Sequence, residues 1–294
     1  MSAALIAVVV SLFLGHLFPA ALPSLRRYDW FIGWLHWLGR HTGREDWPNK
    51  VGLLIAVGLP LLLVGALQFV IDDLAYGLPA FFFALLALLY TWGPRDLNLD
   101  VEAVIEAREP EARRAAAASL FPEGGEPVVE GPTLVEAVFR CALWRWFGVL
   151  FWFLVAGAVG AIGYRLISLC AQGEARRSLP AGQRGAARIT LAVLNWPVAQ
   201  LMTFALALAA DFDRVLAAWR DWHAQGVRLD AGFLGAAARA SVASELAEED
   251  AYAVDGPAQA PDLLELRDAM SLVWRVLLLW LGLLALFVLA GWAT

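Results

Sequence analysis

Five polar side chains near two long apolar stretches are the residues of this sequence best suited to bind a ligand: Arg145, Arg165, Arg188, Asn195 and Gln200. The guanidinium group of arginine offers a planar fork of N–H donors that matches the oxygens of a phosphate or carboxylate. We therefore expect these residues to line a pocket for an amphiphilic or phosphate-bearing ligand. For Arg145 and Arg165 the alternative is that they lie at helix ends and extend their charge toward the membrane surface.

Motifs of the common soluble enzymes are absent from the sequence. It has no G-x-x-x-x-G-K-[ST] phosphate loop, no strand-linked dinucleotide fingerprint, no H-E-x-x-H and no G-x-S-x-G. The four histidines lack a convincing ligand spacing. The adjacent carboxylates of Asp72 and Asp73 could hold a magnesium ion, but such a pair is more often a solvated turn. We expect no catalytic residue, no metal and no cofactor.

The composition favours a membrane protein. Of 294 residues, 60% are hydrophobic and 17% are charged, whereas a soluble domain is nearer half apolar and a quarter charged. The 14 tryptophans fit this interpretation, because tryptophan concentrates at membrane interfaces. The net charge of −6 gives no general attraction to nucleic acid.

The hydropathy pattern predicts an all-α, polytopic membrane helical bundle with four to six membrane segments and amphipathic helices in cytoplasmic loops. We expect one integral membrane domain over residues 1–294. Polar helical segments are expected over residues 95–140 and 211–270, with helix starts at Asp96 or Asn98 and at a capping box formed by Thr133 and Glu136. The candidate spans are residues 2–22, 51–71, 74–94, 146–164, 189–210 and 276–293.

The two middle stretches have unusual sequences for simple spans. Residues 146–164 are bulky in their first half and small in their second, and small residues spaced three or four apart let membrane helices approach closely. We expect this half to pack against protein. Residues 189–210 contain Pro197, which predicts a kinked helix lining protein or a water-filled cavity.

Charge distribution bears on the topology. All but two of the 22 basic residues lie in residues 23–50, 95–140, 171–188 and 211–275. The positive-inside tendency places all four segments in the cytoplasm. That placement favours four full crossings, with residues 146–164 and 189–210 buried or re-entrant. A six-span arrangement is the alternative.

Several motifs resemble the AmpE family. They are FWFLVAGAVGAIGYRLISL at residues 151–169, GQRGAARI at 182–189, LNWP at 194–197 and YTWGPRDLNLD at 90–100. The resemblance implies a bacterial inner-membrane protein that is paired genetically with a peptidoglycan-recycling amidase and linked to β-lactamase induction. It leaves the molecular activity open.

The two middle stretches are also similar, more distantly, to the CobD/CbiB membrane synthases of cobalamin biosynthesis, which use ATP and magnesium. Tyr164 and Arg165 stand at the Tyr–Lys positions of their Y-K-x-x-N-T-L-D-S pattern, but the later Asn-Thr and Asp are missing. Both carboxylates of a second pattern, A-A-R-L-D-D, are also absent at residues 186–191. A magnesium–phosphate reaction needs such oxygens, so the resemblance implies a retained scaffold without that chemistry.

Three functions are therefore open. The first is a regulatory or sensor protein in cell-wall stress and the antibiotic response, which binds membrane lipid or an amphiphilic or anionic ligand. The second is a divergent CobD/CbiB-like synthase. The third is a structural partner of another membrane protein. Nucleic acid is not an expected partner.

Overall fold

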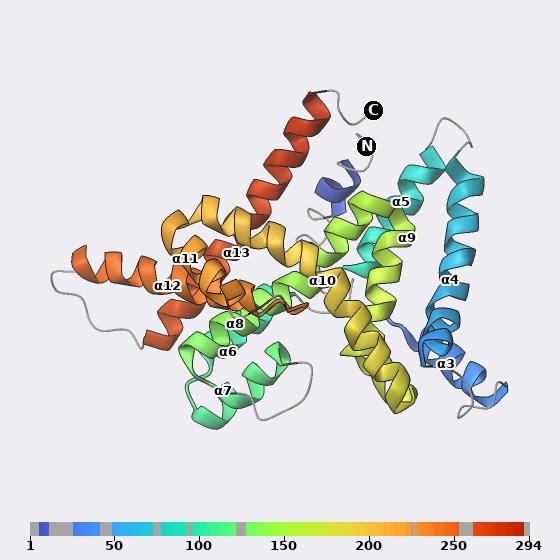
Figure 1. Cartoon of the computed structure of the whole chain (residues 1–294), viewed down its shortest axis with the longest axis horizontal. Helices are drawn as coiled ribbons and strands as arrows, with labels where there is room; N and C mark the ends of the chain where they lie inside the picture. Colours follow the sequence, from blue (N-terminus) through green and yellow to red (C-terminus); the bar gives the residue numbers. More distant parts are fainter. Residues whose placement is uncertain are drawn as a thin grey trace. The chain divides into compact units, whose positions relative to one another are not determined.

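The computed structural model describes residues 6–11, 26–41, 49–72, 78–92, 96–121, 128–224, 226, 228–252 and 261–290. These residues are about 90% helical and contain no strand, which confirms the all-α class. Figure 1 shows the helices along the chain. The predicted span at residues 2–22 and the Asp72–Asp73 turn lie largely outside the described residues.

Four stretches of the described chain are long and apolar enough to cross a membrane, which is typical of an integral membrane protein. α5 (Leu78–Thr91) is also apolar but has only 14 residues. The number of crossings stays a prediction. The four stretches are Lys50–Ile71, Gly131–Ala171, Ala181–Ala209 and Leu264–Leu289.

The chain divides into two compact units, and the single membrane domain stays a prediction. Unit 1 comprises Met1–Pro94, Gly148–Leu194 and Ala285–Thr294. Unit 2 comprises Arg95–Phe147 and Asn195–Leu284.

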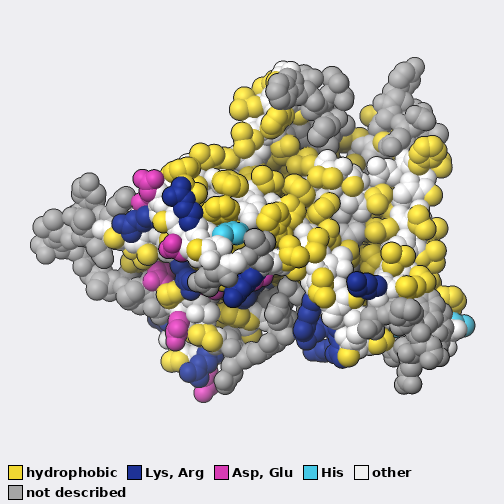
Figure 2. Space-filling model, in the orientation of Figure 1, with side chains coloured by type: hydrophobic (Ala, Val, Ile, Leu, Met, Phe, Trp, Pro, Cys, Tyr) yellow, Lys and Arg dark blue, Asp and Glu magenta, His cyan; other side chains and the backbone are white. Residues whose placement is uncertain are grey.

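Unit 1 is built around α9 (Gly148–Ala171), which packs against both α4 (Asn49–Asp72) and α5. The amphipathic helix α3 (Asp29–His41) and the short η4 (Glu174–Ser178) contact each other beside it. α4 exposes many large apolar side chains, such as Leu62 and Phe69. Figure 2 shows hydrophobic side chains over α4, as expected for a surface that faces lipid.

Unit 2 contains the more polar helices. α8 (Gly131–Ala142) continues into η3 (Leu143–Phe147) and packs against α12 (Gly232–Tyr252). The acidic side chains visible in Figure 2 lie over this unit. Its remaining helices are α6 (Leu97–Glu106), α7 (Pro110–Ala117), η2 (Ala118–Leu120), α11 (Phe212–Ala224) and α13 (Pro261–Leu289), whose residues from Ala285 on belong to unit 1. α10 (Ala181–Ala209) begins in unit 1 and ends in unit 2.

α9 doubles back on itself inside its apolar sequence. Gly157 has a φ of 62°, which glycine adopts at little cost. A Cβ atom on Gly160 would overlap the carbonyl oxygen of Trp152, although eight residues of straight helix would separate these two by about 12 Å. Two limbs therefore lie side by side and meet at a tip at Gly157, and Figure 1 shows the α9 ribbon reversing direction. This is the geometry that a re-entrant segment, favoured above over a six-span arrangement, requires.

Candidate functional site

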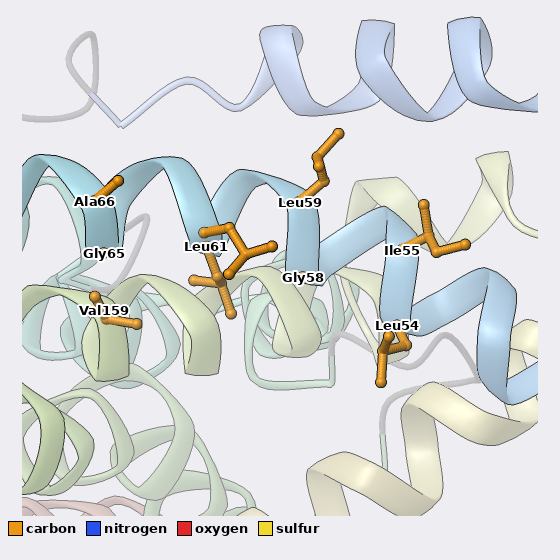
Figure 3. A pocket seen from close by; sticks show the side chains of 9 residues that line it. Leu54, Ile55, Gly58, Leu59, Leu61, Gly65, Ala66 and Val159 are labelled. Atoms are coloured by element: carbon orange, nitrogen blue, oxygen red, sulfur yellow. The ribbon is translucent and has the colours of Figure 1, made fainter.

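An apolar groove of about 780 Å³ runs along α4 beside the second limb of α9. Its volume is in the range of small-molecule sites. From the first to the last lining residue, α4 rises by about 18 Å, so the groove is long as well as apolar. Figure 3 shows its lining, which includes Leu54, Gly58, Leu61, Gly65, Ala66 and Val159.

Two glycines give the groove its depth. A Cβ atom added to Gly58 would meet no other atom within 4 Å, and one added to Gly65 would lie 3.7 Å from Cγ2 of Val159. The two glycines are seven residues apart, so they lie on the same face of the helix. Larger side chains at these positions would fill space that is open in the structure.

One polar side chain lies just beyond this groove, at the tip of α9. A Cβ atom on Gly157 would lie 2.9 Å from Nε2 and 3.4 Å from Oε1 of Gln68. The Oε1 atom is buried and accepts no hydrogen bond from the described residues. The groove is thus apolar along its length and polar at one end, an arrangement suited to binding an amphiphile.

Arg165 completes the C-terminus of α5. Its side chain is 1% exposed, and its Nε donates to the carbonyl oxygen of Thr91 at 2.7 Å. Thr91 is the last residue of α5, and the last carbonyl groups of a helix lack partners within it. The negative end of the helix dipole also favours a cation here. The contact supports a structural role for Arg165.

Two more side chains bind the preceding carbonyl groups of α5. Arg26 Nε donates to Leu89 at 3.1 Å, and the Tyr28 hydroxyl donates to Tyr90 at 3.0 Å. Burial raises the pKa of the Tyr28 hydroxyl, and the nearby charge of Arg165 offsets part of that shift. The hydroxyl therefore stays a neutral donor at physiological pH. Three consecutive carbonyl groups are thus satisfied by side chains.

Arg145 lies in the π-helical turn η3 and forms a buried ion pair. Its Nη1 lies 2.6 Å from Oδ2 of Asp100, and the two side chains are 4% and 1% exposed. Its Nη2 donates to the carbonyl oxygen of Ser119 at 2.9 Å, and its guanidinium lies 5.1 Å from the ring centroid of Trp144. These contacts join α6 and η2 to η3. The charge of Arg145 is balanced within the protein.

Gln200 joins α10 to α11. Its Oε1 accepts a hydrogen bond from Trp219 Nε1 at 2.8 Å, and its Nε2 lies 3.4 Å from His223 Nε2. Asn195 on the same helix is partly buried. α10 stays helical through Pro197, and the kink expected there stays a prediction.

The five predicted ligand residues are divided between the two units: Arg165 and Arg188 lie in unit 1, and Arg145, Asn195 and Gln200 lie in unit 2. Arg188 is exposed on α10. The contacts found for Arg145, Arg165 and Gln200 go to three separate sets of partners. A pocket shared by all five stays a prediction.

Sequence reasoning missed Gln68 and the groove. The available signal was that Gln68 is the only strongly polar side chain in residues 51–71. The spacing of Gly58 and Gly65 was a second, weaker signal. Among the described residues, no group of three His, Cys, Asp or Glu side chains is placed to hold a metal ion.

Comparisons with known proteins give no further guide to the site. No family model matches the chain, and neither a curated protein nor a solved structure matches it. A functional proposal therefore rests on the geometry of the groove and the α9 tip, together with the sequence motifs.

Proposed function

We propose that this protein, in the bacterial inner membrane, binds an amphiphilic molecule in the groove between α4 and α9 and acts as a non-enzymatic regulator or sensor. The observation that carries the proposal is an apolar groove whose last lining residue on α4, Ala66, is two residues before Gln68, which lies against the α9 tip. The hydrocarbon chain of the ligand lies along α4. Each CH₂ group removed from water contributes about 0.8 kcal/mol to binding, so a chain transferred from the aqueous phase gains affinity with its length.

The polar end of the ligand lies at Gln68. A hydroxyl, amide or ammonium group can donate to its Oε1. A bound ligand would therefore touch both α4 and the α9 tip. Because Gln68 lies against Gly157, a ligand that engages Gln68 also acts on the residue at which α9 reverses.

The regulatory part of the proposal comes from the AmpE-like motifs in residues 90–197. They favour a role in cell-wall stress and β-lactamase induction. In such a role the amphiphile is the signal, and the position of the tip transmits it to a membrane-protein partner.

A photoactivatable fatty acid tests the proposed binding. Protein reconstituted in lipid nanodiscs is irradiated with a fatty acid that carries a diazirine on its chain, and the labelled peptides are mapped. We expect labels concentrated on the groove residues of α4 and on Val159. Gly58→Leu fills part of the groove, and displacing about two CH₂ groups of the chain, at about 0.8 kcal/mol each, should weaken labelling by about tenfold.

Gly282→Leu is the matched control, since a Cβ atom there also meets nothing within 4 Å and the residue lies on α13. It should leave the α4 labels unchanged. Labels spread evenly over α4 and α13, or α4 labels that persist in Gly58→Leu, would overturn the proposal.

A further inference from the structure

We propose that a second groove, within unit 2, binds the headgroup of a zwitterionic phospholipid. The groove has a volume of about 510 Å³ and lies between α6 and α13. It is separate from the α4 groove, and the inference does not rest on the function proposed above. Polar residues from both helices line it: Asn98, Glu102, Glu106, Arg267, Ser271 and Trp274.

Helical spacing explains why these side chains meet. On α6 the three polar residues are four apart, and on α13 they are four and three apart. Residues at these separations lie on one face of a helix. The polar face of α6 and the polar face of α13 therefore border the same groove, and apolar residues such as Val101 and Met270 form its base.

The groove carries both signs of charge. Glu102, Glu106 and Arg267 are exposed, and among the described residues none of them forms an ion pair. Two carboxylates suit an ammonium group, and a guanidinium suits a phosphate. A ligand that carries an ammonium and a phosphate a few bonds apart would satisfy both. A purely anionic ligand would face two unfavourable carboxylates.

Trp274 adds a fixed aromatic wall. Its Nε1 donates to Asn98 Oδ1 at 3.0 Å, and its ring lies 5.3 Å from that of Trp146, centroid to centroid. The side chain is still 36% exposed. The face of an indole ring attracts ammonium groups, so Trp274 and the glutamates favour the same part of the ligand.

The position of the groove along α13 indicates that the ammonium and the phosphate belong to a lipid headgroup. After Arg275 the helix is apolar to its end at Leu289, and Leu278 is 63% exposed. Trp274 thus lies where polar sequence meets the apolar span, the level at which tryptophan and lipid headgroups are found in membranes. A headgroup bound in the groove would leave its acyl chains beside the exposed apolar side chains of α13.

Lipid retention measures the preference directly. The full-length protein is placed in nanodiscs of equimolar phosphatidylethanolamine and phosphatidylglycerol and is then released into mild detergent. Native mass spectrometry counts the lipids that stay bound. We expect the wild type to retain phosphatidylethanolamine over phosphatidylglycerol, because only the former carries the ammonium group.

Two sets of variants separate the two charges. The double variant Glu102→Gln/Glu106→Gln should lower the preference about tenfold, the loss of one charge-assisted hydrogen bond. Arg267→Gln should weaken retention of both lipids equally, because both contain phosphate. Glu111→Gln and Arg108→Gln remove exposed charges outside the groove and should change neither quantity.

The inference would be overturned if the wild type retained the two lipids in the equimolar ratio of the nanodisc. It would also be overturned if the double variant Glu102→Gln/Glu106→Gln kept the preference for phosphatidylethanolamine. Displacement of the lipid by free phosphoethanolamine at a similar concentration would show a soluble ligand instead. Circular dichroism checks that each variant is folded. None of these outcomes depends on the α4 groove, which Gly58→Leu tests independently.

Discussion

Units 1 and 2 each bury an arginine in apolar surroundings, and they stabilise it in different ways. Arg165 in unit 1 donates to the neutral carbonyl group that ends α5. Arg145 in unit 2 is paired with the carboxylate of Asp100. The first arginine depends on a helix dipole and the second on a full negative charge. Removal of Arg165 leaves a neutral carbonyl oxygen without its donor, whereas removal of Arg145 leaves a buried carboxylate without its ion-pair partner. The two losses should lower the free energy of unfolding by different amounts.

The largest expected effect is at Arg145. Arg145→Met leaves the Asp100 carboxylate buried without its ion-pair partner, and we expect the free energy of unfolding to fall by about 3–5 kcal/mol. Denaturant titration in detergent micelles measures it. The double variant Arg145→Met/Asp100→Leu removes both charges and should recover most of the loss. No recovery would contradict the ion pair as the cause.

Arg165→Met should lower the free energy of unfolding by less than Arg145→Met does. It leaves a neutral carbonyl oxygen unsatisfied, for which we expect a loss of about 1–3 kcal/mol. The same titration gives the value. Arg165→Lys keeps a donor and a charge near the end of α5 and should lose less than Arg165→Met. A cost for Arg165→Met as large as that for Arg145→Met would remove the distinction between the two arginines.

Substitution by alanine should lower the stability of the protein more at the reversal in α9 than at the proline in α10. Gly157→Ala places a Cβ atom on a residue with a φ of 62° and a ψ of −147°, a region that essentially only glycine adopts, at a cost of about 1–3 kcal/mol. Pro197 lies inside a continuous helix, so Pro197→Ala restores a backbone donor and should not destabilise the protein. Thermal unfolding of the two variants side by side measures both. The opposite order would contradict the break at Gly157.

The smallest effect is expected at Gln200. Gln200→Leu removes hydrogen bonds to Trp219 and His223 that are only partly buried, and we expect a loss of about 0.5–1.5 kcal/mol. Tryptophan fluorescence should also change, because the Trp219 indole loses its acceptor. Loss of ligand labelling on α4 by this variant, with unchanged stability, would instead support a ligand-binding role for Gln200.

Local features of the fold were predictable from the sequence. Asp96 was one of two expected starts of a helix, and its Oδ1 accepts from the Asn98 backbone N–H at 3.0 Å at the N-terminus of α6. The small half of residues 146–164 was expected to pack against protein, and Gly163 lies against Leu61 of α4. Both depend on neighbouring residues or on helical periodicity, which the sequence displays directly.

The capping box at Thr133 and Glu136 was wrong. α8 begins two residues earlier, at Gly131, with proline in its first turn. Glu136 instead forms an ion pair with Arg239 of α12 at 2.6 Å. The local spacing was right for a cap, but Pro132 is already favourable at a helix start, and a partner from a distant segment engages the carboxylate.

The structural contacts of the predicted ligand residues could not be derived from the sequence, because their partners are distant along the chain. Asp100 is 45 residues from Arg145, and Thr91 is 74 residues from Arg165. Nothing near either arginine in the sequence indicates that its charge is already engaged. The charge distribution favoured a re-entrant arrangement for residues 146–164, but it did not locate the reversal at Gly157, because a charge-free stretch carries no local signal for the turn.

The proposed function depends on an amphiphile being bound in the groove along α4. A density map tests this directly. A single-particle map of the protein in lipid nanodiscs should show elongated density from Leu54 to Ala66, ending beside Gln68, and Gly58→Leu should remove it. An empty groove in the wild type, or the same density in the variant, would contradict amphiphile binding at this site.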